Sequence, residues 1–204
     1  MRYTGPKSRL CRREGMNLFG SQKYQKVLQR KPNIPGAHGS SRMGKLTEYA
    51  KQLREKQKAK RAYGLSEKQF SRCFDEASRN KGVTGEVLFQ ILERRLDNAL
   101  YRAGFALTRF QSRQFASHGL FLLNGRRVDV PSIQLRVGDI VEIRPKSAKS
   151  PVFQNNLDEL KDYSAPSWLN VDPKKLRFEV AELPGPHHFD AFVDSQLIVE
   201  FYSR

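Results

Sequence analysis

The sequence predicts an α+β protein: a mainly helical chain that carries a small module of two helices and a curled β-sheet, behind a basic and largely irregular N-terminal extension. Several segments place apolar residues at helical spacing behind a capping residue, which predicts helices. An Asn-Gly pair stands between two short apolar runs, which predicts a hairpin. With 204 residues, 38% of them hydrophobic, the chain is long enough for one or two domains with a core.

The positive charge is concentrated near the start of the chain. Lys and Arg outnumber Asp and Glu by 37 to 21, which gives a net charge of +16. Residues 1–63 hold 17 of these cations against three glutamates, whereas residues 64–204 hold 20 against 18. Such an excess attracts polyanions or an anionic membrane surface, and nucleic acid is the first candidate. Because residues 1–45 are rich in Pro and Gly and poor in large apolar side chains, we expect them to order mainly against that partner.

Membrane-spanning proteins and secreted proteins with a signal peptide are excluded at this stage. No apolar run approaches the roughly 18 residues that span a bilayer, and the N-terminus lacks the apolar region of a signal peptide. Cys11 and Cys73 cannot form a disulfide framework and fit a reducing compartment as ordinary thiols. We therefore expect a soluble protein of a bacterial-type cytoplasm without a membrane partner.

The first predicted helix covers residues 46–64, with Thr47 as its N-cap and Gly64 at its end. Within the segment 51–61 only Glu55 opposes the cations, and like charges four residues apart destabilise a helix unless something neutralises them. We interpret this surface as a phosphate-binding face rather than a solvated charged face. Its cations are Lys51, Arg54, Lys56, Lys58, Lys60 and Arg61.

Two further helices supply apolar faces. One runs from Ser66 to about Lys81, because Ser66 and Gln69 have the spacing of a capping box. The other covers residues 85–104 as a single helix. The predicted core positions are Phe70, Cys73, Phe74 and Ala77 in the first, and Leu88, Ile91, Leu92, Leu96, Ala99 and Leu100 in the second.

The module follows as a short helix over 109–118, a hairpin and a strand within 135–145. Thr108 and Gln111 again have capping-box spacing, and Gly119 can take the left-handed conformation that ends a helix. The Asn-Gly pair at 124–125 favours a type I′ turn, because both of its central residues need a positive φ.

Four arginines surround this bend. Arg109 and Arg113 share a face beside the positively polarised N-terminus of the short helix, and Arg126 and Arg127 leave the turn directly. Each alone could lie over the protein surface. Together they predict a groove that binds an RNA backbone by shape and charge.

Histidine and tryptophan residues offer other chemistry. His187 and His188 lack a neighbouring carboxylate cluster, so a solvated loop is favoured over a metal site. His38 and His118 are better placed to meet phosphate. Trp168 is interpreted as core or protein interface rather than a base-stacking platform. Residues 197–202 are predicted to form a buried strand or packed terminal segment, and a candidate surface for a neighbouring protein.

Several stretches together resemble one known family: "RYTGPKSRLCRREG", "PGAHG", "QLREKQKAKRAYG", "EKQF", "GVTGEVL", "ERRLDNALYRAGFA" and "LIVEFYSR". The succession "LTRFQSRQFASHG", "LNGRRVDVPS" and "VGDIVEI" also resembles a small RNA-binding module that RNA-modifying enzymes and tRNA synthetases share. Over essentially its whole length the chain resembles the S-four family of bacterial small-subunit ribosomal proteins.

The resemblance implies an organisation and a function. It implies an RNA-binding module at 94–155 inside a helical domain split into 46–93 and 156–204, whose last segment packs back on the first, after the extension 1–45. The family is a primary binder of 16S ribosomal RNA, recognises a multi-helix junction of the 5′ domain, nucleates assembly of the 30S body and contributes to translational accuracy. Its partners include the fifth and twelfth small-subunit proteins, and messenger RNA where it enters the subunit.

The resemblance and the charge pattern together give the predicted RNA-binding residues. In the extension they are Arg2, Lys7, Arg9, Arg12, Arg13, His38 and Lys45. In the first helix they are Lys51, Arg54, Lys58 and Arg61. In the module they are Arg95, Arg109, Arg113, Gln114, His118, Asn124, Gly125, Arg126 and Arg127.

The chain departs from the family in one respect. Some members bind zinc through four N-terminal cysteines, but here the first pair of positions holds Ser8 and Cys11, and the next cysteine is Cys73. A tetrahedral thiolate site cannot be assembled from this segment. We expect the zinc-free type, with no metal, cofactor or catalytic residues.

Two alternatives remain at this stage. An RNA-modifying enzyme could carry the same module, but it would need a catalytic domain with a placed aspartate or a nucleotide-binding loop. A basic protein that only condenses on nucleic acid would not need the Asn-Gly hairpin or the capping boxes.

Overall fold

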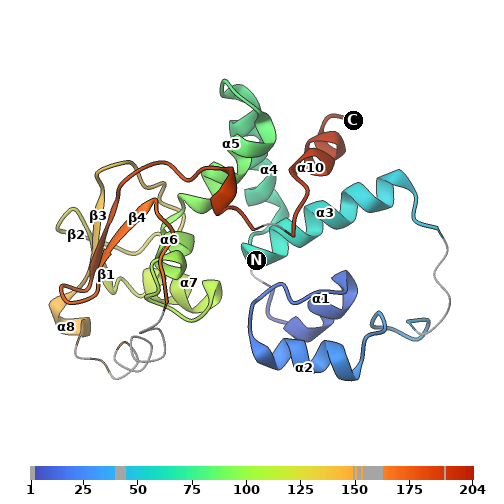
Figure 1. The fold of residues 1–204 in the computed structure, drawn as a ribbon, viewed down its shortest axis with the longest axis horizontal. Coiled ribbons are helices and arrows are strands. Elements are labelled where there is room, and N and C mark those ends of the chain that lie inside the picture. Colours follow the sequence, from blue (N-terminus) through green and yellow to red (C-terminus); the bar gives the residue numbers. More distant parts are fainter. Residues whose placement is uncertain (1–2, 40–44, 149, 151–152, 154–162, 191) are drawn as a thin grey trace. The chain divides into compact units, whose positions relative to one another are not determined.

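The computed structural model describes residues 3–39, 45–148, 150, 153, 163–190 and 192–204. The chain divides into two compact units, which are shown in Figure 1. Unit 1 contains Met1–Gly85 and Asp190–Arg204, and unit 2 contains Glu86–Phe189. The segment that follows the module in sequence is thus shared between the two units.

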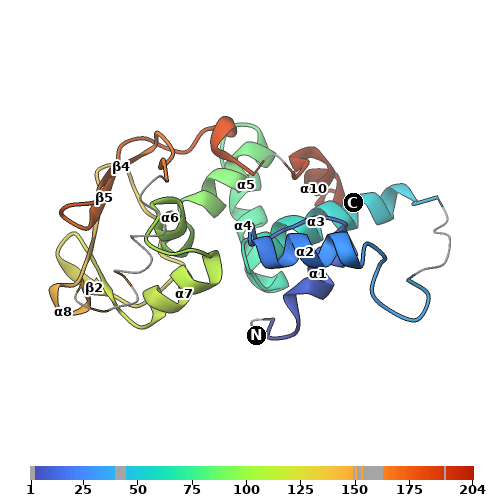
Figure 2. The same ribbon diagram turned by 60° about the horizontal axis from the view of Figure 1, so that its bottom comes forward.

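Unit 1 is helical. Thr47 caps the third helix by accepting a hydrogen bond from the Ala50 amide, and the capping box of Ser66 and Gln69 opens the fourth, as predicted. The last helix lies beside α3, as both Figure 1 and Figure 2 show. The helices are α1 (Lys7–Glu14), α2 (Gln22–Arg30), α3 (Glu48–Ala62), α4 (Glu67–Arg79) and α10 (Ser195–Tyr202).

The terminal segment is packed, but it is a helix, so the strand alternative is wrong. The Asp194 carboxylate accepts hydrogen bonds from the Gln196 and Leu197 amides and thereby caps α10. Tyr202 stacks on Phe70 and Phe74 of α4, with ring centroids 6.3 and 4.5 Å apart. The predicted core positions of α4 are buried, as is Ile198.

The N-terminal extension contains two helices that were not predicted. Gly15, at φ +70°, ends α1, and Cys11 and Leu18 are buried. The Glu14 carboxylate pairs with Arg54 and Arg61 of α3, which ties α1 to the rest of the unit. The remaining described part of residues 1–45 has no strand and no further helix. Packing within the chain, and not only a partner, therefore orders this segment.

Glu67 connects three elements of unit 1 and makes its stability sensitive to acid. Partial burial alone would raise the pKa of Glu67, but hydrogen bonds from Lys56, Lys60 and Tyr202 outweigh it and lower the pKa from 4.5 to about 2. This contribution to stability is complete above pH 4.5 and is lost as the pH falls towards 2. We expect Glu67→Gln to lower the free energy of unfolding at pH 7 by about 1 kcal/mol or less, because solvent screens the half-exposed side chain.

The measurement is urea unfolding of both proteins at pH 7 and pH 3. The difference between them should shrink at the lower pH. Glu76→Gln, on the exposed side of the same helix, is the control and should have little effect at either pH. A difference for Glu67→Gln that stays constant between the two pH values would contradict the assignment of this network.

Unit 2 begins with a helix that the sequence predicted as continuous and that the structure breaks. Residues 85–104 form α5 (Thr84–Glu93) and α6 (Leu96–Arg102), and Arg95 between them is extended, with φ −63° and ψ 138°. The amides of Leu96 and Asp97 donate to carbonyl oxygens in the segment 131–135, and the Leu135 amide donates to the Arg94 carbonyl. These hydrogen bonds to a segment that is distant in sequence replace the intrahelical hydrogen bonds that would continue the helix. The predicted apolar positions are all buried.

The predicted short helix and hairpin are confirmed. Thr108 caps α7 (Arg109–Ser117), and Gly119 follows it at φ +64°. The turn residues Asn124 and Gly125 have φ +49° and +77°, which join β1 (Phe121–Leu123) to β2 (Arg126–Val128). The predicted strand within 135–145 is β3 (Ile140–Ile143), which pairs antiparallel with β1 and is followed by α8 (Pro145–Ala148).

The sheet is larger than predicted. β4 (Leu169–Asp172) and β5 (Arg177–Val180) extend it to the antiparallel order β2-β1-β3-β5-β4, and η1 (Pro186–His188) follows. Residues 163–189 therefore belong to unit 2, although the predicted range 156–204 assigned them to the helical domain. Within the described part of that range, α10 is the element that packs on α3. Trp168 is fully buried in this core, in agreement with its interpretation as a core residue.

Candidate nucleic-acid interface

The end of α7 and the hairpin meet at Gly119. A β-carbon placed on Gly119 would lie 2.6 Å from Arg127 Nε, so the Arg127 guanidinium packs against the backbone of Gly119, just beyond the end of α7. Arg144 Nη1 donates to the Gly119 carbonyl oxygen at 3.1 Å. Cations at a helix C-terminus are stabilised by its partial negative charge. The hairpin and the helix end thus form one continuous surface.

The exposed polar side chains of this surface come from both elements. Gln114 on α7 and His118, the C-cap residue that follows the helix, lie one turn apart, and both are exposed. Arg126 and Arg127 on β2 are exposed as well. We call these four residues the helix–hairpin surface. Its guanidinium and imidazole groups are donors that suit phosphate oxygens.

The other predicted arginines of the module have a different environment. Arg95 is only 3% exposed and forms two hydrogen bonds with the Asp97 carboxylate, at 3.0 and 2.8 Å. Arg113 Nη1 lies 3.3 Å from the same carboxylate. Arg109 Nε donates to Asn98 Oδ1 at 2.7 Å. The arginines around the bend therefore fall into two groups, one exposed and one held against buried acceptors.

Asn124 has a structural task in the turn. Its amide group donates to Asp139 Oδ1 and accepts from the Ile140 amide, both at 2.9 Å. These bonds join the hairpin to the start of β3. Gly125 supplies the positive φ that the turn requires.

The expectation that only Glu55 opposes the cations of α3 is wrong. Glu14 of α1 and Glu67 of α4 provide carboxylates that are far away in sequence but adjacent in the fold. Lys56 is 6% exposed, and its ammonium group lies 4.4 Å from the Phe201 ring centroid. The ion pairs of this face are Lys51–Glu48, Arg54–Glu14, Lys56–Glu67, Lys58–Glu55, Lys60–Glu67 and Arg61–Glu14.

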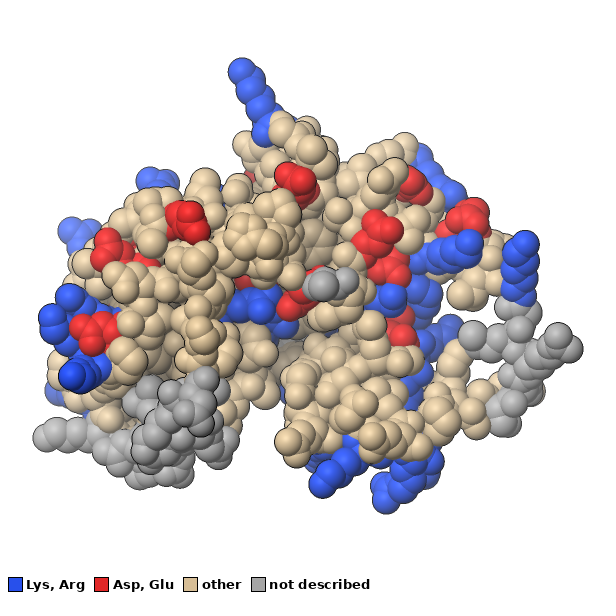
Figure 3. Space-filling view, in the orientation of Figure 1, with Lys and Arg blue, Asp and Glu red and all other residues tan. Residues whose placement is uncertain are grey.

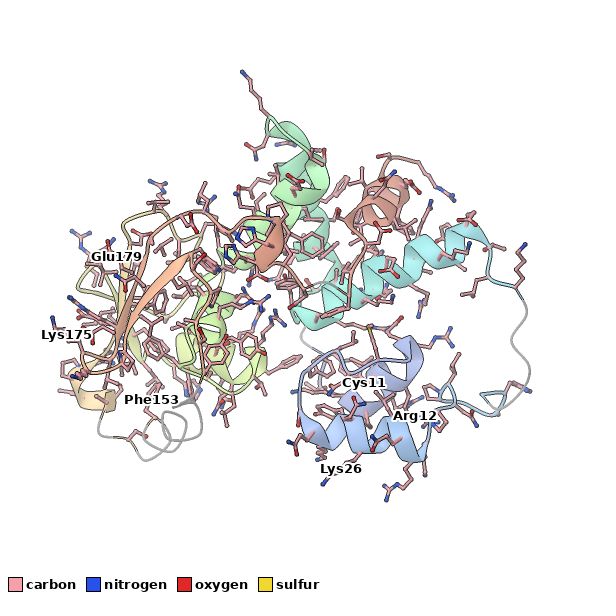
Figure 4. The ribbon with its side chains drawn as sticks, in the orientation of Figure 1. Cys11, Arg12, Lys26, Phe153, Lys175 and Glu179 are labelled. Atoms are coloured by element: carbon pink, nitrogen blue, oxygen red, sulfur yellow. The ribbon has the colours of Figure 1, made fainter. Side chains whose placement is uncertain are left out.

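The predicted contacts in the N-terminal extension differ in exposure. Arg9, Arg13, His38 and Lys45 are exposed, and Lys7 is half-buried near the Phe19 ring. The Arg12 side chain, labelled in Figure 4, donates to the carbonyl oxygens of Lys31 and Asn33 and so fixes the chain after α2. Arg2 lies outside the described residues.

A basic ridge on α2 was not predicted from the sequence. Lys23, Lys26 and Arg30 are exposed at positions i, i+3 and i+7, which places them on one side of the helix. No Asp or Glu occurs between residues 15 and 47. Figure 3 shows cations without acidic neighbours on the α2 side of unit 1, and Lys26 points away from the unit in Figure 4. Ser21 as a helix-starting residue and the spacing of the three cations could have indicated this ridge.

The histidine pair at 187–188 is used within unit 2. His188 Nδ1 accepts from the Gly185 amide at 3.1 Å, so in the neutral ring Nε2 carries the proton and donates to Ser167 Oγ at 3.0 Å. Partial burial and the neighbouring His187 lower the pKa of His188. In this tautomer His188 does not act as a base towards Ser167. Across the described ranges, no group of three or more His, Cys, Asp or Glu residues could hold a metal ion.

Comparison with known proteins identifies the two parts of the chain. Residues 2–93 match the ribosomal protein S4/S9 N-terminal domain, and residues 94–141 match the S4 domain. The small ribosomal subunit protein uS4 of Dictyoglomus turgidum is 51% identical over 207 aligned positions, which cover 100% of this chain and 99% of the relative. That of Borrelia hermsii is 45% identical over 199 positions, with 97% and 96% covered.

Together with the helix and hairpin, these matches define a ribosomal protein with an S4 RNA-binding domain. The chain belongs to the uS4 family, and it is a structural, non-enzymatic component of the small ribosomal subunit. The interpretation as an RNA-modifying enzyme is thereby set aside. In the part of the chain that the structure describes, no helix has the length and apolar character to cross a membrane.

Proposed function

We propose that this protein is a primary binder of 16S ribosomal RNA that recognises a multi-helix junction of the 5′ domain and nucleates assembly of the 30S body. It acts in the cytoplasm, within the small subunit. Its neighbours there include the fifth and twelfth small-subunit proteins, with which it contributes to translational accuracy, and messenger RNA where it enters the subunit. The likeness of the whole chain to its uS4 relatives supports this assignment.

One observation carries the RNA-binding part of the proposal: the Arg127 guanidinium packs against Gly119, just after α7, so the exposed donors of the hairpin and of the helix end lie close together. RNA helices are recognised mainly through their shape, phosphates and 2′-hydroxyl groups. A rigid set of donors on two elements can match phosphates at a fixed spacing. A flexible basic tail cannot provide such a match.

A second basic surface supports binding to more than one RNA helix. The α2 ridge belongs to unit 1, and the helix–hairpin surface belongs to unit 2. Each unit therefore brings its own phosphate-binding residues. Arg9, Arg13 and Lys45 add exposed charge to unit 1, whereas the α3 cations already have carboxylate partners and contribute less.

The test is competition between the 5′-domain junction of 16S RNA and a plain duplex of equal length, across a salt series. We expect a junction preference that persists near physiological salt. Arg126→Ala with Arg127→Ala should weaken junction binding more than duplex binding. The slope of log K against log salt should also become smaller, by about 0.7–0.9 for each phosphate that the variant no longer neutralises.

The matched control is Lys174→Ala with Lys175→Ala, which removes the same charge from the turn between β4 and β5. Figure 4 shows Lys175 on the opposite side of the sheet from α7. This variant should keep the junction preference. If the unmodified protein binds both RNAs equally, and salt abolishes both interactions together, the protein condenses non-specifically on nucleic acid. That result would contradict the proposed function.

A further inference from the structure

Two buried carboxylates lie beneath the arginines at the start of α7. Glu93 at the end of α5 is 0% exposed, and Asp97 in the first turn of α6 is 4% exposed. Buried carboxylates are costly unless they are paired and hydrogen-bonded. In a protein that binds a polyanion they also oppose the ligand electrostatically. A function of these two carboxylates should therefore offset both the cost of burying them and their repulsion of a polyanion.

Each carboxylate holds guanidinium groups in defined directions. Glu93 binds Arg102 through two hydrogen bonds, at 2.9 and 2.8 Å, and Arg109 Nη2 lies 3.9 Å from it. Asp97 binds Arg95 through two bonds and Arg113 through one. The two carboxylates thus hold four arginines that come from the α5–α6 break, α6 and α7.

Asn98 completes this network. Its side-chain nitrogen donates to Glu93 Oε2 at 2.7 Å, and its side-chain oxygen accepts from Arg109 Nε at 2.7 Å. Ser112 of α7 donates to the Asp97 carbonyl oxygen, which fixes α7 against α6. The Arg109 guanidinium also lies 4.8 Å from the Tyr101 ring centroid. These interactions fix the direction of a guanidinium group and not only the position of its charge.

We infer that Glu93 and Asp97 are positioning residues for RNA binding, which hold Arg109 and Arg113 in the directions that match the RNA junction. This inference rests on the proposed function. Arginine loses considerable rotamer freedom when it binds a phosphate, and a side chain that is already held loses less. Directed guanidinium groups favour RNA of one shape, whereas mobile ones bind any phosphate. The carboxylates therefore increase selectivity although they reduce the net positive charge.

The experiment compares two neutral variants of nearly equal size, Asp97→Asn and Glu93→Gln. Removing a negative charge should strengthen binding to any RNA if only net charge mattered. We expect Asp97→Asn instead to weaken junction binding by about tenfold and to leave duplex binding unchanged or stronger. The matched control is Asp129→Asn, an exposed carboxylate next to β2, which should slightly strengthen binding to both RNAs.

A double-mutant cycle separates positioning from a merely structural effect. If Asp97 acts through Arg113, Asp97→Asn should have little further effect on junction binding in an Arg113→Gln background. Full additivity of the two changes would overturn the inference, and so would a folded Asp97→Asn variant that behaves like Asp129→Asn. Glu93→Gln with Arg109→Gln forms an independent cycle, which decides the question if Asp97→Asn does not fold by circular dichroism.

The outcomes also distinguish this inference from the proposed function. If the unmodified protein prefers the junction and the carboxylate variants keep that preference, only the positioning role fails. If the unmodified protein shows no junction preference, the proposed function fails, and the inference fails with it.

Discussion

Replacing Phe121 by alanine is expected to lower the free energy of unfolding of unit 2 by about 3–5 kcal/mol, the range for deletion of a buried aromatic ring. Phe121 is completely buried in β1, an inner strand of the sheet that pairs with both β2 and β3. Its ring lies 6.3 Å from that of Phe105 and 5.8 Å from that of Phe153. Truncation would leave a cavity where three segments of the chain meet.

The measurement is urea unfolding followed by the fluorescence of Trp168, which is buried in the same core. Leu122→Ala is the control, because Leu122 is the next residue of β1, points to the other face of the sheet and is half-buried. It should cost about 1 kcal/mol or less. Similar losses for the two variants would contradict the assignment of the inner and outer faces of the sheet.

The starts of α3, α4 and α7 and the hairpin could be predicted because their signals are local. Thr47, Ser66 and Thr108 each act within three residues of their own position, and the Asn-Gly turn depends only on its own φ angles. The break at Arg95 could not be predicted, because it depends on hydrogen bonds to residues 131–135. The pairing of β5 with β3 is equally non-local. The local sequence of 163–189 does not indicate which part of the chain this segment pairs with.

The environment of the candidate RNA-binding residues also depends on non-local contacts that the sequence does not reveal. The sequence shows where cations lie, but ion pairs such as Arg61–Glu14 and Lys60–Glu67 form between separate helices. Nothing in the local sequence indicates that the Glu93 and Asp97 carboxylates are both buried and paired with arginines. The α2 ridge is the reverse case, because its helical spacing and its lack of acidic neighbours are visible in the sequence alone.

Replacing Lys23, Lys26 and Arg30 by glutamine is expected to reduce RNA affinity strongly at low salt. If each side chain neutralises one phosphate, the slope of log K against log salt should fall by about two to three, at about 0.7–0.9 per phosphate. The loss should not come from unfolding of α2. Cations three and four residues apart repel each other, so their removal leaves the helix as stable or more stable. Binding to the 5′-domain junction RNA across a salt series measures the effect.

The matched control changes Lys68, Arg72 and Arg79 of α4 to glutamine, which removes the same three charges from the same unit. These residues are exposed, but Asp75 and Glu76 lie on the same helix and compensate them. If the α2 ridge binds RNA, the α4 variant should change the slope far less. Equal changes would mean that only the net charge of unit 1 matters. A difference between the variants would show that the protein concentrates phosphate binding where its sequence provides no carboxylate to compete for the same cations.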